Sequence, residues 1–278
     1  MPFNDDNSKE IIDDVSGGSL GLSLVAYFTA DENVAFGAEV YEGGRRIDLK
    51  AYSADGGKQT GGGKREKVSG FSKASRHRLF KKLAALNQER AGMPIFVTLT
   101  YPNEFPADFE TYKRHLDTWS KRLARRYPDA FFIWRLEFQK RGAPHYHLLL
   151  FGVERIDKDW LSRSWYEAVG SGDEKHLRAG TTVERIRSWK KTWSYCGKYL
   201  GKVDAGHGEN GRVWGVYNRK EYDMCVSVEY VSLSRKAFYQ ARRILAKATG
   251  YSLRGCDGRQ GLVAFVDADF FSRLFDNG

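Results

Sequence analysis

Cysteine and long apolar runs are scarce in this 278-residue chain. The three cysteines, Cys196, Cys225 and Cys256, are far apart and form no Cys-x-x-Cys pair, which argues against a zinc finger or a disulfide framework. No stretch of about 18 apolar residues occurs, and the first residues lack the basic-then-apolar order of a signal peptide. We therefore expect a protein of the reducing cytoplasm with no membrane partner.

A phosphate-binding loop is also missing, although residues 56–65 are rich in glycine and lysine. For Lys64, the motif would need a glycine at the position of Lys58 and a Ser or Thr where Arg65 stands. We expect a basic loop here and no nucleotide site.

Positive charge is in excess, with a formal net charge of +10. Residues 1–20 hold five acidic residues against Lys9, a net −4 that leaves +14 for the rest of the chain. The 41% of hydrophobic residues are enough for a globular core. An acidic partner is expected, and nucleic acid is the commonest one, although a membrane surface would also attract a basic protein.

Residues 131–151 have the pattern of an antiparallel hairpin. Aromatic and aliphatic residues at 131–138 and 148–151 favour strands, and residues 140–144 supply a turn. A turn centred near Arg141 would place Glu137 opposite His145.

His147 would lie on the same sheet face as His145, because side chains two residues apart on a strand point the same way. Three potential metal ligands, Glu137, His145 and His147, would then meet on one face. Two imidazoles and one carboxylate suit a divalent cation such as Mg or Mn, with positions left for a phosphate oxygen and water. The alternative is a pair of ordinary half-exposed histidines near a surface carboxylate.

A second polar group follows at residues 195–202, where a Tyr-x-x-Lys unit occurs twice. Helical spacing would put Tyr195, Lys198, Tyr199 and Lys202 on one face. Because a free phenol titrates near pH 10, a tyrosine nucleophile needs positive charge close by, from a lysine or a metal ion.

Three segments in fixed order resemble the motifs of the HUH endonuclease superfamily. Residues 96–102 resemble the first motif and residues 144–150 the second, with its histidine-hydrophobic-histidine signature. Residues 195–202 resemble the third motif in the Tyr-x-x-x-Tyr-x-x-Lys form of the two-tyrosine class of rolling-circle replication initiators.

The resemblance implies a site-specific nick in single-stranded DNA, with strand transfer through a 5′-phosphotyrosine link and a free 3′-hydroxyl. By similarity, His145 and His147 bind the metal, Tyr195 and Tyr199 are nucleophiles, and Lys202 closes the third motif. Glu137 as third ligand depends mainly on the hairpin spacing, and Lys198 is a further candidate for neutralising charge.

The resemblance also implies partners, namely origin hairpin DNA, a host DNA polymerase and a host helicase, since the chain shows no helicase domain. A relaxase or transposase with the same chemistry is one alternative. A non-catalytic origin-binding repressor is another.

The order of predicted elements indicates an α+β fold with a central antiparallel sheet, ferredoxin-like or RNA-recognition-like, flanked by helices. Strands are predicted at residues 20–29, 39–52 with a turn at 42–45, 95–100, 131–138, 145–151, 181–186, 212–218, 222–230 and 261–266. Helices are predicted at residues 72–90, 109–127, 157–168, 188–201, 234–249 and 270–275, with a polar loop at 170–180. The predicted domains are an acidic tail (1–20), accessory strands, basic loop and basic helix (21–92), an HUH core (93–230), and a C-terminal helix and strand packing on that core (231–278).

The helix predicted at residues 72–90 is unusually basic. Its cationic residues are Lys73, Arg76, Arg78, Lys81 and Lys82. One interpretation is that they contact the DNA backbone, which would give affinity for DNA without selecting a base sequence. The alternative is that they form a helix face exposed only to solvent.

Overall fold

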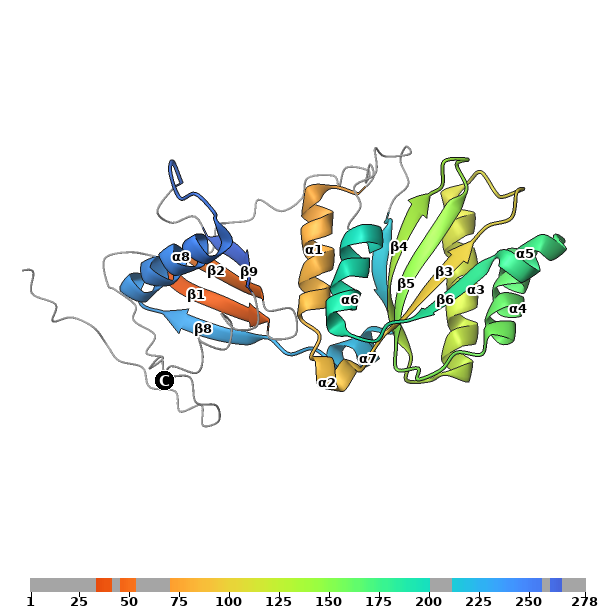
Figure 1. Ribbon diagram of the computed structural model, residues 1–278, viewed down its shortest axis with the longest axis horizontal. Coiled ribbons are helices and arrows are strands. Elements are labelled where there is room, and N and C mark those ends of the chain that lie inside the picture. The colour runs from red at the N-terminus through yellow and green to blue at the C-terminus, as the bar shows by residue number, and fades with distance from the viewer. Residues whose placement is uncertain (1–33, 42–45, 54–70, 201–211, 257–260, 267–278) are drawn as a thin grey trace, which may run out of the picture. The chain divides into compact units, whose positions relative to one another are not determined.

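The chain divides into two compact units in a computed structural model (Figure 1). The larger unit is Arg65–Val226, and the smaller one combines Met1–Lys64 with Ser227–Gly278. The structure describes residues 34–41, 46–53, 71–200, 212–256 and 261–266. Predictions for the acidic tail, the strand at 20–29, the basic loop at 56–65, Lys202 and the helix at 270–275 lie outside these residues.

The larger unit is built on a five-stranded antiparallel sheet of order β6-β3-β5-β4-β7. The strands are β3 (Ile95–Thr100), β4 (Phe131–Phe138), β5 (Pro144–Phe151), β6 (Thr181–Arg185) and β7 (Trp214–Tyr217). Strands β3 and β4 flank β5 and are joined by α3 (Phe109–Arg126), which is the split β-α-β arrangement. The predicted α+β class is confirmed.

Helices cover both faces of this sheet (Figure 1). On one face lie α3 and α4 (Lys158–Val169), where Trp119 packs on Phe132 with ring centroids 5.6 Å apart. On the other lie α1 (Lys73–Ala84) and α6 (Trp189–Tyr195). The central strands β3, β4 and β5 are therefore largely buried, whereas the edge strand β6 has exposed side chains.

Three predicted boundaries in the larger unit need correction. The helix predicted at 72–90 is divided into α1 and α2 (Gln88–Ala91), because the Asn87 side chain accepts hydrogen bonds from two backbone N–H groups and begins a new helix. The predicted loop at 170–180 contains α5 (Glu174–Ala179), capped by Asp173. The strand predicted at 222–230 is α7 (Arg219–Met224) followed by β8 (Glu229–Leu233).

The smaller unit is a four-stranded antiparallel sheet of order β8-β1-β2-β9, covered by one helix. Its other elements are β1 (Val34–Tyr41), β2 (Arg46–Ser53), β9 (Leu262–Phe265) and α8 (Arg235–Thr249). Phe238 of α8 packs on Phe36 with ring centroids 4.7 Å apart, and the same core includes Leu49 and Leu245.

The C-terminal helix and strand therefore pack on β1 and β2, which differs from the predicted packing on the catalytic core. The physical reason is the alternation of β1 and β2, whose apolar face needs a cover that α8 supplies.

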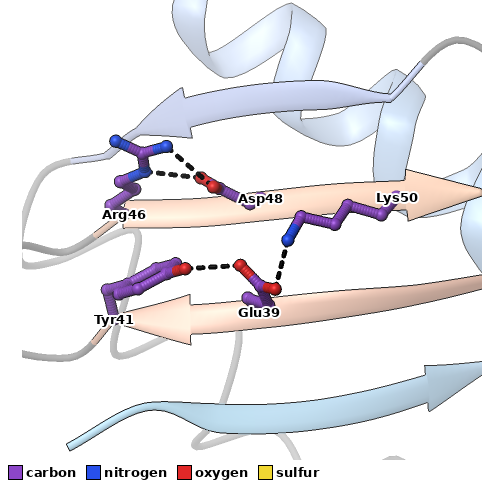
Figure 2. Close-up of polar contacts among 5 residues, drawn as sticks. All are labelled: Glu39, Tyr41, Arg46, Asp48 and Lys50. Carbon is purple, nitrogen blue, oxygen red and sulfur yellow. Dashed lines mark hydrogen bonds and ion pairs between the residues drawn. The ribbon is translucent and has the colours of Figure 1, made fainter. Parts of the chain in front are cut away.

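The opposite face of this small sheet is polar (Figure 2). Tyr41 and Lys50 both donate hydrogen bonds to the carboxylate of Glu39. Arg46 makes two bonds to Asp48, at 2.5 and 2.7 Å. Buried charges need such partners, so the carboxylates of β1 and β2 are engaged by cations of the same sheet.

Candidate active site

The β4–β5 hairpin brings the predicted ligands together in the predicted register. Glu137 of β4 lies directly opposite His145 of β5, and His147 follows two residues later on the same face. The pairing of Glu137 with His145, which was predicted from a turn centred near Arg141, is confirmed. Because β5 is the middle strand, its histidines rest on the most constrained backbone of the sheet.

Each histidine has a defined partner. The Nδ1 atom of His145 is 2.9 Å from the Thr100 hydroxyl, and the Nε2 atom of His147 is 3.3 Å from a carboxylate oxygen of Glu137. The two imidazole rings have centroids 4.5 Å apart. The other Glu137 oxygen, Oε1, and Nδ1 of His147 are buried and have no hydrogen-bond partner among the described residues. Both atoms are therefore available to a further group.

Thr100 is itself firmly held at the end of β3. Its backbone carbonyl accepts hydrogen bonds from Trp165 Nε1, at 2.9 Å, and from His176 Nε2, at 2.8 Å. This anchoring fixes the hydroxyl that contacts His145. Thr100 was not singled out from the sequence, although β3–β5 pairing alone places it opposite His145.

The donor set fits a divalent cation by its chemistry, since two imidazoles and a carboxylate are common ligands. Among the described residues, however, no group of three histidine, cysteine or acidic side chains is arranged around one point as a metal would require. Binding through Glu137, His145 and His147 together would therefore need side-chain adjustment. Burial lowers the pKa of His145 to about 4, with a smaller contribution from His147, so the imidazole is neutral at pH 7, as a ligand must be.

Both predicted tyrosines pack against the aromatic ring of Phe96, which lies on the same sheet face as His147. The ring centroid of Phe96 is 5.0 Å from Tyr195, 5.2 Å from Tyr199 and 5.6 Å from His147. Tyr195 and Tyr199 stack on each other at 5.6 Å. Phe96 of β3 thus packs against both tyrosines and His147. Its place in the first motif was noted, but this packing role was not predicted.

The two tyrosines have different surroundings. The ring of Tyr199 is 5.1 Å from that of His147, whereas the Tyr195 hydroxyl donates a hydrogen bond to the carboxylate of Glu184 on β6. Tyr199 also lines an open cavity of about 540 Å³, and Tyr195 does not. The cavity is lined by Glu137, Phe138, Gln139, Lys140, His145, His147, Lys198 and Tyr199.

Lys198 places a cation beside Tyr199. Its Nζ atom lies 4.8 Å from the centroid of the Tyr199 ring, and the side chain is exposed. A hydrogen bond with Tyr199 raises the pKa of Lys198, so the ammonium group is charged at neutral pH. Lys202, the other lysine of the motif, lies outside the described residues.

The helix that carries the tyrosines changes form between them. The predicted helix at 188–201 is α6 followed by a π-helical turn at Cys196–Leu200, anchored by the buried side chains of Cys196 and Leu200. π-Helical turns of this kind frequently lie at functional sites. No sequence signal predicted the change.

The basic cluster of α1 lies apart from the cavity lining. Lys73, Arg76 and Arg78 are exposed, while Lys81 and Lys82 are half-buried. Lys82 lies over the ring of Tyr222 at 5.1 Å, so part of its role is packing. The three exposed residues are the better candidates for phosphate contacts.

All residues of the cavity and both tyrosines fall inside one segment that matches a protein-family model. Residues 94–204 match the family model of the replication-associated protein ORF2/G2P. This match supports a rolling-circle replication initiator and hence DNA binding. The matched segment belongs to the larger unit, and all described elements of the smaller unit lie outside it.

No curated protein and no solved structure matched the chain. Across the described part of the chain, no helix is long and apolar enough to cross a membrane.

Proposed function

We propose that the larger unit nicks single-stranded DNA through a tyrosine and transfers the strand, starting and ending rolling-circle replication in the manner of a two-tyrosine HUH endonuclease. The observation that carries this proposal is the position of Tyr199. Its ring contacts that of His147 in a cavity also lined by Glu137, His145 and Lys198. A phenol, two imidazoles, a carboxylate and an ammonium group together suit phosphodiester transfer better than a passive binding surface.

In the proposed reaction, the Tyr199 oxygen attacks a DNA phosphorus and forms a 5′-phosphotyrosine bond. The bond from phosphorus to the 3′ oxygen breaks, the leaving oxygen takes up a proton, and the phenol loses one. One ester replaces another, so the strand can later be transferred to a new 3′-hydroxyl. The Lys198 ammonium group beside Tyr199 offsets charge on the phosphate, and Lys202 is assigned the same task by resemblance.

Glu137, His145 and His147 would hold a divalent cation, Mg or Mn. When bound, such an ion supplies electrostatic stabilisation of a non-bridging phosphate oxygen. The chain's own contribution is to keep His145 neutral by burial and to fix it through Thr100. Glu137 Oε1 is buried and has no hydrogen-bond partner among the described residues, which supports a role for this carboxylate beyond its contact with His147.

We further propose that Tyr199 makes the first cut and that Tyr195 is held in reserve. A hydrogen bond to the Glu184 carboxylate stabilises the protonated phenol, and the negative charge opposes a phenolate at Tyr195. Once Tyr199 is linked to DNA, Tyr195 would attack the next junction. The two nucleophiles would then alternate between cleavage and resolution.

The partners follow from this function as predictions. They are single-stranded DNA with an origin hairpin, contacted in part by α1, together with a host helicase and polymerase. A cytoplasmic location also stays a prediction.

The test uses single-stranded oligonucleotides from the protein's own replicon, labelled at the 5′ end. With Mn or Mg, we expect a shortened product whose 3′-hydroxyl a polymerase can extend, and no product with chelator. His145→Ala and His147→Ala should each abolish cleavage, while His115→Gln on α3, away from the cavity, should not. Tight DNA binding without any cleavage would contradict the proposal and favour an origin-binding repressor.

A further inference from the structure

The helix of the smaller unit has two contrasting faces. On its inner face, α8 buries Phe238, Leu245 and Ala246 against the sheet. On its outer face, Lys236, Gln240, Arg243 and Lys247 are all exposed. These four positions are spaced i, i+4, i+7 and i+11, which aligns them in one stripe along the helix.

The stripe is about 16 Å long, since an α-helix rises about 1.5 Å per residue. It presents three cations and one amide, and α8 contains no acidic residue. Lys236, Arg243 and Lys247 form no ion pair with an acidic group of the described residues.

The sheet beneath α8 does not neutralise this charge either. The carboxylates of Glu39 and Asp48 lie on the opposite face and are engaged by Lys50 and Arg46 (Figure 2). Glu229 of β8 pairs with Val40 and so lies on the same sheet face as α8, but within the described residues it forms no ion pair with Lys236, Arg243 or Lys247. The ions of β1 and β2 are thus paired on one face, whereas the three cations of the α8 stripe have no ion-pair partner among the described residues. An unpaired row of cations on a well-packed helix suits a polyanion.

We propose that the outer stripe of α8 binds double-stranded DNA, as a second DNA-binding surface separate from the nicking site. Lys236, Arg243 and Lys247 would contact phosphates or guanine, and Gln240 could pair with an adenine edge. A helix fits the major groove, about 12 Å wide. Single-stranded DNA is usually bound on exposed aromatic side chains, and the stripe contains none.

This second surface rests on the proposed function only in that the protein acts on DNA, and it does not require that the protein nicks DNA. It assigns duplex recognition to a part of the chain outside the family match. If α8 recognises the origin sequence, the residues that line the cavity do not also have to recognise it.

The experiment compares two full-length triple variants that each remove two lysines and one arginine. The test variant is Lys236→Gln, Arg243→Gln, Lys247→Gln, and the matched control is Lys113→Gln, Lys121→Gln, Arg125→Gln on the exposed surface of α3. Affinity for a 30-base-pair origin duplex is measured by fluorescence anisotropy at several salt concentrations, and circular dichroism confirms folding.

We expect the α8 variant to lose at least about tenfold in duplex affinity, with the slope of log affinity against log salt reduced by about 2 to 3, and the control to lose much less. Cleavage of a short single-stranded oligonucleotide should be unchanged. Equal losses in both variants, or no loss in the α8 variant, would overturn the inference. Duplex binding that depends on α8 in a protein that never cleaves DNA would overturn the proposed function alone.

Discussion

Tyr195 and Tyr199 carry the same chemical group, four residues apart, and the structure gives them different partners. The hydroxyl of Tyr195 is held by Glu184, whereas Tyr199 faces His147 and has Lys198 beside it. A carboxylate and an ammonium group act in opposite directions on a phenol. The two tyrosines therefore differ in their electrostatic surroundings as well as in their position.

Glu184→Ala should change which tyrosine is used first. The substitution removes the hydrogen bond that holds the Tyr195 hydroxyl, which stabilises the uncommitted Tyr195 by about 1 kcal/mol. The share of the first covalent DNA adduct that forms on Tyr195 should therefore rise about fivefold. Peptide mass spectrometry of the DNA adduct measures this share. Glu174→Ala on α5 is the matched control, because its carboxylate pairs with Arg178 and does not contact a tyrosine. A fall in adduct at Tyr195 would instead show that Glu184 acts as its base.

His176 predicts a dependence of stability on pH. Burial lowers its pKa below the ordinary value of 6.5, so the unfolded chain binds a proton more readily than the native protein. The stability due to neutral His176 is complete above about pH 6.5 and is lost as the pH falls toward its native pKa.

His176→Gln keeps a donor for the Thr100 carbonyl but removes the titration. We expect its urea midpoint to fall less than that of wild type between pH 7.5 and pH 5.5. An equal fall in both proteins would contradict this assignment.

At the scale of elements, α1 and α8 share an unusual charge pattern. Neither has an acidic residue in its first turn, a feature shared with the tyrosine helix α6, whereas α3, α4 and α5 begin with Glu110, Asp159 and Glu174. Cations near a helix N-terminus oppose the helix dipole and cost about 0.3–1 kcal/mol each. Local rules broken in this way are typical of functional surfaces.

Lys73→Glu in α1 should therefore separate stability from binding. We expect the free energy of unfolding to rise by about 0.3–1 kcal/mol and DNA affinity to fall. Chemical denaturation and anisotropy with single-stranded DNA measure the two effects. Lys113→Glu on α3 makes the same charge change away from α1 and should not weaken binding comparably. Unchanged affinity in Lys73→Glu would leave α1 as a solvated face.

The hairpin shows what local sequence can determine. Alternation and a short turn fix a register, so Glu137 opposite His145 could be predicted without a structure. The contact of Tyr195 with Glu184 could not, because it depends on how α6 packs beside the edge strand β6. Likewise, an apolar face on β1 indicates that it needs a cover, and only the tertiary fold shows that α8 supplies it.

At the scale of the whole molecule, the chain divides into two compact units. The larger unit contains the cavity lined by His145, His147 and Tyr199 within the family match, and the smaller unit combines strands from both halves of the sequence with the basic helix α8. On the two proposals made above, the positive charge of the chain would contact DNA at two places, beside the cavity and on α8.

The central claim is a covalent bond between DNA and a tyrosine of the larger unit. The most direct measurement is denaturing electrophoresis of the protein after incubation with a 3′-labelled single strand from its own origin, with Mn or Mg. We predict a labelled protein band that persists through denaturation and disappears when Tyr195 and Tyr199 are both changed to Phe. A folded protein that binds the strand tightly but gives no such band, or a band that survives the double substitution, would contradict the claim.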